Sequence, residues 1–532
     1  MPKPPNILLV MADQMRFDAL GVETPTLRTP HLDRLAREGL RCTRAYAPTA
    51  VCLPCRASVV TGQYPSSHGA MHNLAALSED HPVLLPKLLS RAGYYTHLIG
   101  KSHFSPCHDP VSREGAPHIH NLNHWRRWHG PWYGFERADL SIGHTIEPHG
   151  AGMHYGAWLA DRGVDRQRYF GRHKGAGSDD WYTAFGVWDL PAEHHQSAWV
   201  AETAMAAIDR AAGRERPFFI WANFADPHNP CMVPEPWASM YDPAALPRYG
   251  FKPGEPACFA QKPPFYQEIL DRPGAYQARP SDPDLPGAGN VCSLGWDEAT
   301  VQRHAAAYHG MVALMDHHLG RILAHLDATD LARETVVVFT SDHGELLGDH
   351  GFFFKSLVAY EESIRVPFLV RHPGRIAAGT RSDAPLSLVD LAPSFAALAG
   401  VPADHRFEGI DQVPHWTGGG PVRDEVIIEE RPGDRPWNQR ILVRGRWKLA
   451  LYAGRPWGEL YDIGADPHHV RNLWDDPAHR PVRDELCARI LAHEMNKRHP
   501  NPGDSAAAAL AVGDAPRRWP HVAYGVMDLD PR

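Results

Sequence analysis

Five apolar runs constrain the fold of this chain more than any other feature. They are NILLVMA at 6–12, YYTHLIG at 94–100, PFFIWANF at 217–224, TVVVFT at 335–340 and VPFLV at 366–370. Runs that show no regular apolar–polar alternation are typical of strands buried on both faces of a sheet. Segments with helical spacing lie between them, such as residues 31–47, where Gly39 is expected to stop the helix. This alternation predicts an α/β fold with a mostly parallel sheet sandwiched by helices.

The length of 532 residues exceeds what one compact core usually holds, so a second, smaller domain is expected. Short apolar runs at 424–430, 439–452 and 458–463, followed by a helical pattern, predict antiparallel strands and a helix. We therefore predict a catalytic domain over 1–415, a C-terminal α+β domain over 416–500 and an extended tail over 501–532. The strand pattern fades at 104–200 and 231–295, which are predicted to be loop insertions near the sheet edge.

Composition limits the partners and the compartment. The formal net charge of −8 provides no global field for nucleic acid or acidic membranes, so an anion site must be a local pocket. No apolar run approaches the ~20 residues of a membrane helix, and the N-terminal run is too short for a signal peptide. The 8 cysteines are scattered along the chain, which excludes a disulfide framework. We expect a cytoplasmic protein that binds neither nucleic acid nor membranes.

Polar residues follow four of the predicted strands at the point where each strand ends. The four pairs are Asp13 with Gln14, Lys101 with His103, Asp226 with His228, and Asp342 with His343. Sheets of this class place their ligands at the carboxyl ends of the strands, so these side chains are expected to meet. Carboxylate and amide oxygens suit Ca²⁺, Mg²⁺ or Mn²⁺. The first and last pairs therefore predict a divalent metal site, whereas Asp349 and His350 are assigned to a solvated turn.

The segment VCLPCRASVVTG at 51–62 holds two cysteines three residues apart. A Cys-x-x-Cys pair that opens a helix after a strand is typical of a redox dithiol, and Cys52 and Cys55 allow that placement. Arg56 and the small residues after it have no role in such a site. A zinc site needs a second pair of ligands at matching spacing, and Cys107 and His108 are too isolated to supply it. Neither interpretation accounts for the whole segment.

The same segment resembles the signature of the type I sulfatases of the alkaline phosphatase superfamily, which is Cys-x-Pro-x-Arg followed by small residues and Thr-Gly. Other stretches resemble further elements of that family in the same order, at 6–21, 29–47, 93–104, 339–370 and 460–473. Little resemblance is carried by 104–215 and 235–300. The resemblance implies an alkaline phosphatase-like fold, with a large mixed, mostly parallel sheet and a smaller C-terminal α+β domain.

The resemblance also implies a modified nucleophile and a metal. Cys52 would be converted to Cα-formylglycine by a formylglycine-generating enzyme that reads Pro54 and Arg56. One hydroxyl of the hydrated aldehyde attacks sulfur, and the other expels sulfate by elimination. The metal positions of the family match Asp13, Gln14, Cys52, Asp342 and His343. Other sulfatases often have Asp at the position of Gln14 and Asn at that of His343, which leaves Ca²⁺ or Mn²⁺ as the one expected ion, with Mg²⁺ less favoured.

The remaining roles follow from matched positions. Lys101 and Lys355 would clamp the sulfate oxygens, where negative charge grows in the transition state. His103 would take the proton of the second hydroxyl, and His228 would protonate or polarise the leaving oxygen and contact the substrate. Arg56 would hold the modified residue and offset charge. Asn73 would contact the sulfate. Cys55 departs from the family, which usually has Ser or Ala there, but cysteine is a small isostere.

These residues predict a sulfuric ester hydrolase of the arylsulfatase type that acts on a small organic sulfate ester. A phosphonate monoester hydrolase or phosphodiesterase with the same machinery is an alternative, because phosphodiesters and sulfate monoesters carry the same single charge. Choline-sulfatase-like specificity is another, because RRWHGPWYG at 126–134 offers rings for cation–π contact. A catalytically silent binding protein would have lost matched positions, and none is lost. The tail suggests a homo-oligomer, either a dimer or a tetramer.

Overall fold

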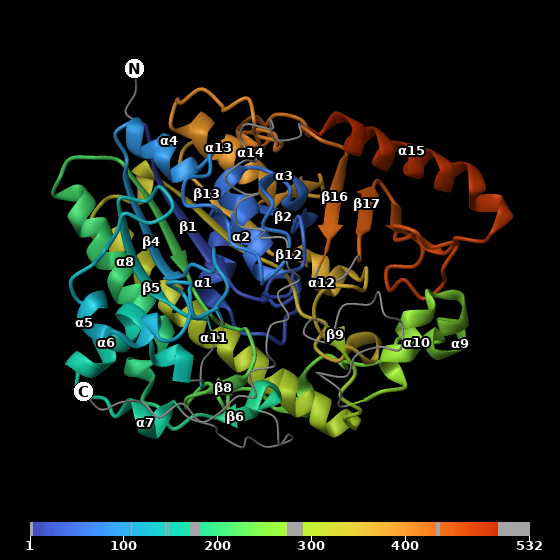
Figure 1. The fold of residues 1–532 in the computed structure, drawn as a ribbon, viewed down its shortest axis with the longest axis horizontal. Coiled ribbons are helices and arrows are strands. Elements are labelled where there is room, and N and C mark those ends of the chain that lie inside the picture. Colours follow the sequence, from blue (N-terminus) through green and yellow to red (C-terminus); the bar gives the residue numbers. More distant parts are fainter. Residues whose placement is uncertain are drawn as a thin grey trace.

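The computed structural model describes residues 4–107, 109–143, 146, 148–170, 181–273, 291–431 and 437–497. Its central sheet has eight strands in the order β14-β2-β13-β10-β1-β7-β4-β5 (Figure 1). In that order the strands span Thr380–Ser382, Leu40–Cys42, Phe368–Arg371, Thr335–Ser341, Asn6–Ala12, Phe218–Asn223, Tyr95–Lys101 and Arg137–Ser141. The five strands from β10 to β5 are parallel, and β13 runs antiparallel to β10 and β2. The sheet is therefore mixed and mostly parallel, as expected.

Strand β1 shows why its sequence has no polar alternation. Leu8 and Val10 belong to one hydrophobic core, and Ile7 and Leu9 belong to another on the opposite face of the sheet. Both faces are covered by helices, so every residue of the strand is buried. The first core includes residues of α1 (Pro30–Glu38), α8 (Gln196–Ala212) and α11 (Glu298–Ala328). The second includes residues of α2 (Cys52–Thr61), α4 (Leu85–Arg91) and α13 (Leu391–Leu398).

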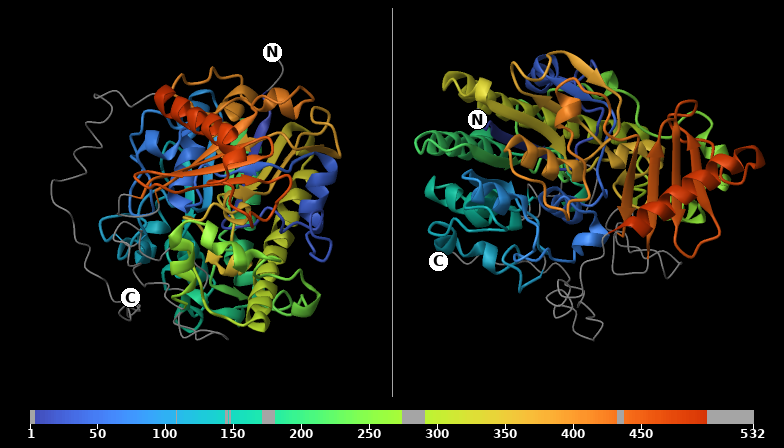
Figure 2. Two further views of the ribbon diagram at one scale, coloured as in Figure 1. Left: turned by 90° about the vertical axis from the view of Figure 1, so that its right-hand side faces the viewer. Right: turned by 90° about the horizontal axis from the view of Figure 1, so that it is seen from above.

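The C-terminal region forms a separate four-stranded antiparallel sheet with a helix against it. Its strands are β16 (Glu425–Glu430), β17 (Gln439–Arg444), β18 (Trp447–Tyr452) and β19 (Gly458–Asp462), and the helix is α15 (Arg480–Asn496). Figure 2 (right) shows this sheet and α15 at one end of the molecule. Alternate residues of β16 pack toward the main body and toward the layer of α15. The α+β organisation is confirmed, while the boundaries at 415, 416 and 500 stay predictions.

The stretch 104–200 contributes more than loops. Strand β5 pairs in parallel with β4 and forms one edge of the central sheet. The same stretch also holds α5 (Leu122–Trp125), α6 (Met153–Asp161), α7 (Arg166–Tyr169) and β6 (Phe185–Val187), and β6 pairs with β8 (Cys231–Val233). The strand was not recognised because its sequence, RADLS, is half polar. Asp139 is buried there by pairing with His97 and Arg137, at 2.7 and 2.9 Å.

The second stretch, 231–295, carries short elements over its described residues. They are β8, α9 (Glu255–Cys258), α10 (Pro264–Leu270) and β9 (Val291–Cys292). Gly39 stops α1 as expected, and Leu40, taken as part of the helical pattern, begins strand β2 instead. A Cβ atom at Gly39 would lie 2.2 Å from the carbonyl oxygen of Val370, so this close approach of two strands requires glycine. The predicted tail at 501–532 lies outside the described residues.

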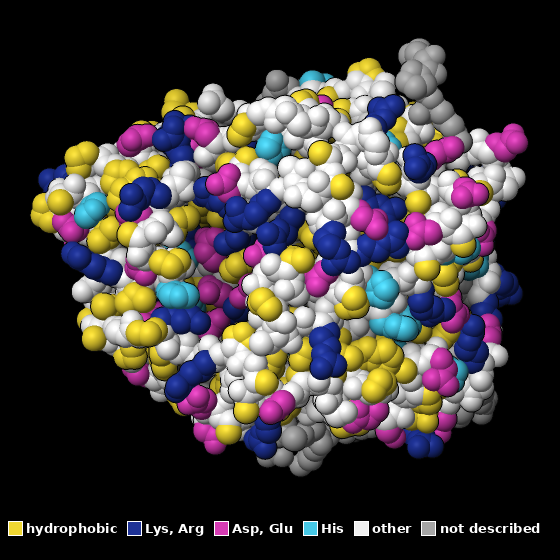
Figure 3. Space-filling view, turned by 180° about the vertical axis from the view of Figure 1, so that it is seen from behind, with side chains coloured by type: hydrophobic (Ala, Val, Ile, Leu, Met, Phe, Trp, Pro, Cys, Tyr) yellow, Lys and Arg dark blue, Asp and Glu magenta, His cyan; other side chains and the backbone are white. Residues whose placement is uncertain are grey.

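The surface carries both signs of charge. On the face opposite that of Figure 1, Lys and Arg side chains gather in a band across the middle, with acidic side chains beside and below it (Figure 3). No helix among the described residues has the length and apolar character needed to cross a bilayer.

Candidate active site

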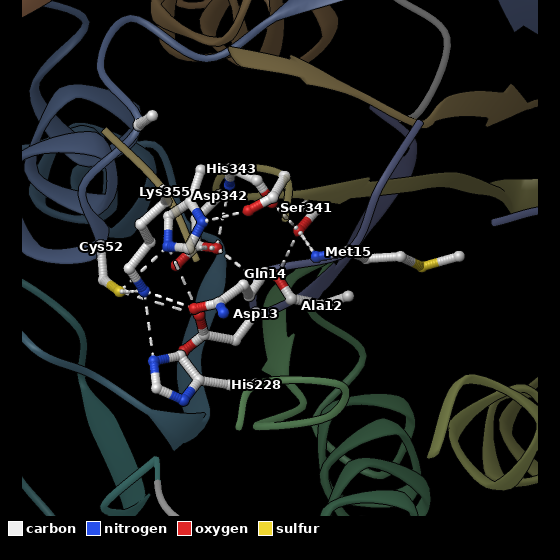
Figure 4. A network of polar contacts seen from close by, with 12 residues as sticks. Ala12, Asp13, Gln14, Met15, Cys52, His228, Ser341, Asp342, His343 and Lys355 are labelled. Carbon is white, nitrogen blue, oxygen red and sulfur yellow. Dashed lines mark hydrogen bonds and ion pairs between the residues drawn. The ribbon is translucent and has the colours of Figure 1, made fainter. Parts of the chain in front are cut away.

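The metal-site candidates meet at the carboxyl ends of β1 and β10. These strands are parallel neighbours with Ala12 opposite Ser341, so the residues that follow each strand converge. The ligand atoms of Asp13, Cys52, Asp342 and His343 all lie within 4.8 Å of one another, and all four side chains are buried (Figure 4). The backbone N–H of Gln14 donates to Asp342 Oδ1 at 3.1 Å, which fixes the two strand ends against each other.

Cys52 is the first residue of α2, and its thiol marks the position that the modified side chain would take. Its Sγ lies 3.0 Å from His343 Nε2, 3.2 Å from Lys355 Nζ and 3.7 Å from Asp13 Oδ1. The start of the helix is fixed from outside, because Leu53 N–H donates to Asn73 Oδ1 at 3.1 Å. The structure thus places Asn73 at the N-terminus of the nucleophile helix.

Arg56 lies one turn further along α2 and is fully buried. Its Nε donates to Asp342 Oδ2 at 2.9 Å, and its Nη1 donates to Asn223 Oδ1 at 2.8 Å and to the carbonyl of Lys101 at 3.0 Å. Its Nη2 lies 3.6 Å from Asp13 Oδ2 and makes no hydrogen bond. One guanidinium therefore connects α2 to three strand ends.

Lys101 is the last residue of β4 and pairs with Asp13 through its Nζ, and His103 follows two residues later. His103 has a positive φ of 52°, which is rare outside glycine and needs support from its surroundings. That support is Glu114, whose carboxylate accepts the backbone N–H groups of His103, Phe104 and Ser105 at 2.6, 2.9 and 2.8 Å. Glu114 lies in a stretch without family resemblance, and nothing in its sequence context indicated this role.

Lys355 lies between the other groups of the site. Its Nζ is 3.2 Å from Cys52 Sγ, 3.2 Å from His228 Nε2 and 2.5 Å from Gln14 Oε1. Gln14 must turn its oxygen toward Lys355, because its amide nitrogen donates to Asn229 Oδ1 at 3.0 Å and to the Glu345 carboxylate. Figure 4 shows Lys355 reaching between Cys52 and His228. Glu345 is a second bracing residue that sequence analysis missed.

The charges of the site act on one another across short distances. Burial and the neighbouring Cys52 raise the pKa of Asp13, but Lys101, His228 and Arg56 outweigh them, and the pKa lies below its usual value. Burial lowers the pKa of His103 to about 4, although its hydrogen bond with Cys52 opposes this. Burial and the Lys355 charge lower the pKa of His228. Burial lowers the pKa of His343, but Asp342 and Cys52 together outweigh it and the net shift is upward.

The donor set fits a hard divalent cation. Two buried carboxylates and an imidazole converge with the nucleophile position, and both carboxylates have oxygens within reach of one point. The Nη2 atom of Arg56 lies 3.6 Å from Asp13 Oδ2 and offsets part of the negative charge of the two carboxylates. Asp13, Asp342, His343 and the modified Cys52 would hold the ion. Gln14 lies beside them with its oxygen on Lys355, and its assignment as a ligand stays a prediction.

Two expectations outside this group need correction. Asp349 and His350 are not in a solvated turn: both are buried, with Asp349 paired to Arg16 at 3.0 Å and His350 to Glu255 at 2.7 Å. The aromatic rings expected as a substrate platform are largely structural. Of the rings in 126–134, Trp132 and Tyr133 are buried and Trp128 is half-buried. The Arg113 guanidinium lies 4.6 Å from the ring centre of Trp132 and 5.7 Å from that of Trp128, where an external cation would otherwise bind.

Comparison with known proteins places this geometry in a family. The family model described as Sulfatase matches residues 5–401, which is most of the chain. The chain belongs to the sulfatase family. A second model, N-sulphoglucosamine sulphohydrolase, C-terminal, matches residues 348–496. It covers the last part of the main body together with the antiparallel sheet and α15. The sulfatase family belongs to the alkaline phosphatase superfamily, and the expected membership is confirmed.

Individual relatives differ in their named activities. An arylsulfatase of Clostridium perfringens is 27% identical, over 93% of this chain and 95% of its own. A multifunctional alkaline phosphatase superfamily protein of Trinickia caryophylli is 30% identical, over 92% and 95%. Among solved structures, the phosphonate monoester hydrolase of Agrobacterium radiobacter superposes with a TM-score of 0.75 at 27% identity, over 93% and 96%. The alkaline phosphatase-like fold is thereby confirmed, and the chain is a sulfatase-family hydrolase of ester substrates.

Proposed function

We propose that this sulfatase-family protein is a sulfuric ester hydrolase of the arylsulfatase type that cleaves a small organic sulfate ester. One observation carries the proposal. Cys52, at the start of α2, lies within 4.8 Å of Asp13, Asp342 and His343 and also within 3.2 Å of the Lys355 ammonium. A nucleophile placed between a metal-ligand group and a cation suits attack on an anionic ester.

Two groups supplied after synthesis complete the proposed site. Formylglycine made from Cys52 by a formylglycine-generating enzyme would supply a geminal diol, with one hydroxyl as the nucleophile and the other for release of sulfate by elimination. A Ca²⁺ or Mn²⁺ ion would supply Lewis-acid stabilisation when bound. The described structure supports both through the burial of Cys52 and the converging carboxylates. The modifying enzyme would be a partner only during maturation.

The side chains of the protein perform the remaining steps of the proposed reaction. Lys355 Nζ lies 3.2 Å from Cys52 Sγ and Lys101 pairs with Asp13 beside it, and both would hold the oxygens that gain negative charge. His103, whose pKa is lowered to about 4, is neutral at pH 7 and can accept a proton at a ring nitrogen. His228 would protonate or polarise the leaving oxygen, and its Nε2 lies 3.2 Å from Lys355 Nζ. Arg56 would hold the modified residue in place.

A phosphonate monoester or phosphodiester is the second candidate substrate. Its support is the match to a phosphonate monoester hydrolase over 93% of the chain at a TM-score of 0.75. The residue roles above would stay the same, because the reacting group of either ester carries one negative charge. Choline sulfate has less support as a substrate, because the Arg113 guanidinium already lies over the Trp132 ring that would bind its cationic group.

The proposed domain boundaries are those predicted from the sequence. We propose a catalytic domain over 1–415 and a C-terminal domain over 416–500. The oligomeric state, dimer or tetramer, is to be measured by light scattering.

The deciding experiment compares two chromogenic substrates, an aryl sulfate and an aryl phosphonate monoester or phosphodiester. The protein is co-expressed with the modifying enzyme, and conversion of Cys52 is checked by peptide mass. A kcat/KM that is much higher for the sulfate supports the proposal. A preference for the phosphorus ester moves the protein to the second candidate, and cleavage of neither overturns both.

A further inference from the structure

The side chain of Glu430 extends from the C-terminal sheet into the main body of the protein. It is the last residue of β16 and is 1% exposed. Its carboxylate accepts hydrogen bonds from the Ala50 N–H, from Thr49 Oγ1 at 3.3 Å and from Ser356 Oγ at 2.6 Å. All three donors belong to the main body. A buried carboxylate with this many donors holds them firmly, because each donor would otherwise be left without a partner.

Two of these donors precede the nucleophile. Thr49 and Ala50 lie directly before α2, whose first residue is Cys52. The N-cap residue of that helix, Val51, provides no side-chain cap. The first N–H groups of the helix itself are served elsewhere, because Leu53 N–H donates to Asn73. Glu430 instead holds the N–H of Ala50, two residues before Cys52, and so fixes the segment that leads into the helix.

The third donor follows Lys355. The residues around this lysine have strained backbones: Phe354, Ser356 and Leu357 have φ values of 69°, 69° and 62°. Such conformations are unfavourable outside glycine and persist only when the surroundings hold them. Glu345 holds one side, accepting Phe354 N–H at 2.6 Å, and Glu430 holds the other through Ser356 Oγ. The ammonium of Lys355 is placed by these two carboxylates.

We propose that Glu430 is a positioning residue, which sets the nucleophile and Lys355 relative to each other and makes the C-terminal sheet part of the catalytic machinery. The catalytic meaning rests on the proposed function, which gives Cys52 and Lys355 their roles. The geometric claim does not, because it concerns only which segments Glu430 holds. Within the part of the chain that the structure describes, Glu430 makes no hydrogen bond or ion pair with the metal-ligand group or with Lys355 Nζ, so it acts through the segments that it holds.

The same strand offers a matched control. Glu429 is also 1% exposed, but it points the other way. It accepts Ser66 N–H at 2.9 Å and pairs with Lys497, away from the Lys355 loop. Loss of Glu429 removes an equally buried carboxylate from the same strand without releasing the segments next to Cys52 and Lys355. A purely structural role for Glu430 predicts that the two variants behave alike.

The first test is hydrogen–deuterium exchange of Glu430→Ala, Glu430→Gln and Glu429→Ala in the full-length protein. Glu430→Ala is expected to speed exchange in peptides covering 48–53 and 353–358, while peptides of β1 and β7 keep wild-type rates. Glu429→Ala should leave both segments at wild-type rates. Glu430→Gln is expected to fall between, because its amide can accept from Ala50 and donate to Ser356. Unchanged exchange in both segments of Glu430→Ala overturns the proposal, as does equal loosening in Glu429→Ala.

The second test is kinetic and uses aryl esters with phenols of increasing pKa, of whichever ester class the wild type cleaves. Lys355 Nζ lies 3.2 Å from His228 Nε2, the proposed proton donor, so its displacement should harm poor leaving groups most. For Glu430→Ala we expect kcat to fall on the order of 10²-fold with the poorest leaving group, less with the best, and KM to change little. Equal loss along the series, or the same pattern in Glu429→Ala, contradicts a positioning role. If the wild type cleaves no ester, the proposed function fails, and exchange alone decides whether Glu430 holds these segments.

Discussion

The groups proposed to carry the chemistry and the groups that hold them in place come from different regions of the molecule. Asp13, Lys101 and Asp342 lie at the ends of parallel strands. Their braces, Glu114, Glu345 and Glu430, come from a stretch between strands, from a loop after β10, and from the C-terminal sheet. The chemistry needs particular residue types at particular points of the site. A bracing residue, by contrast, needs only a buried carboxylate that can accept hydrogen bonds from backbone N–H groups.

The largest effect is expected at the nucleophile. Cys52→Ala should lower kcat by more than about 10³-fold, because no neighbouring group can replace the modified side chain. Melting temperature and circular dichroism should stay close to wild type, since a small side chain replaces a small one. The variant is assayed with the better chromogenic ester. A kcat within tenfold of wild type would show that the reaction does not pass through Cys52. The strand ends would then no longer be the region that carries the chemistry.

The next effect concerns metal retention. Asp342→Asn should lower bound metal and reduce kcat by roughly 10²-fold, because it removes charge from the ligand group and weakens the bond to Arg56. Bound metal is measured by mass spectrometry after dialysis, and activity is measured with and without added Ca²⁺ or Mn²⁺. Asp349→Asn is the matched control, since this buried aspartate pairs with Arg16 and lies outside the ligand group. Equal metal loss in both variants would argue against a specific site at Asp342.

A brace should matter less than the groups it holds. Glu114→Ala leaves three backbone N–H groups without their acceptor, so we expect the free energy of unfolding to fall by about 2 kcal/mol or more. The loop that carries His103 should loosen, with kcat falling about 10-fold to 10²-fold. Glu114→Gln keeps one acceptor oxygen and should recover part of both losses. Urea unfolding and steady-state kinetics check this. Wild-type kcat in Glu114→Ala would mean that His103 needs no brace.

The same division explains how much could be predicted from the sequence. The strand ends were identifiable because an apolar run followed by a carboxylate occurs twice in parallel strands, at Asp13 and Asp342. Strand β5 could not be identified in the same way. Its Asp139 and Arg137 form an ion pair within the sheet, so the strand has no apolar pattern in its sequence. The burial of Asp349 likewise depends on Arg16, more than three hundred residues away in sequence.

The three bracing glutamates were missed for a related reason. A glutamate that accepts backbone N–H groups looks like any other glutamate in the sequence, because its partners have no side-chain signature. Its role depends on the path of a loop: Glu114 accepts the backbone N–H of His103 and Glu430 accepts the hydroxyl of Ser356, and both partners have a positive φ. Such strained residues are defined by tertiary structure. Braces of this kind become visible only once the chain is folded.

The smallest effect on kcat is expected from a substitution far from the site. It tests whether low pH destabilises the fold or inactivates the catalytic groups. His304 of α11 is 2% exposed among Phe185, Trp296 and Phe353, and burial lowers its pKa to about 3. In the unfolded chain His304 takes up a proton near pH 6.5, but in the folded chain it stays neutral until the pH is near 3. The free energy of unfolding therefore falls as the pH falls from about 6.5 toward 3. Each such histidine contributes up to about 1.4 kcal/mol per pH unit in that window. His304→Phe should therefore flatten the dependence of unfolding free energy on pH, while kcat at pH 7 stays at the wild-type value. Urea unfolding at several pH values between 4 and 7 measures the slope. An unchanged slope would mean that His304 is protonated equally in both states and that acid sensitivity arises elsewhere.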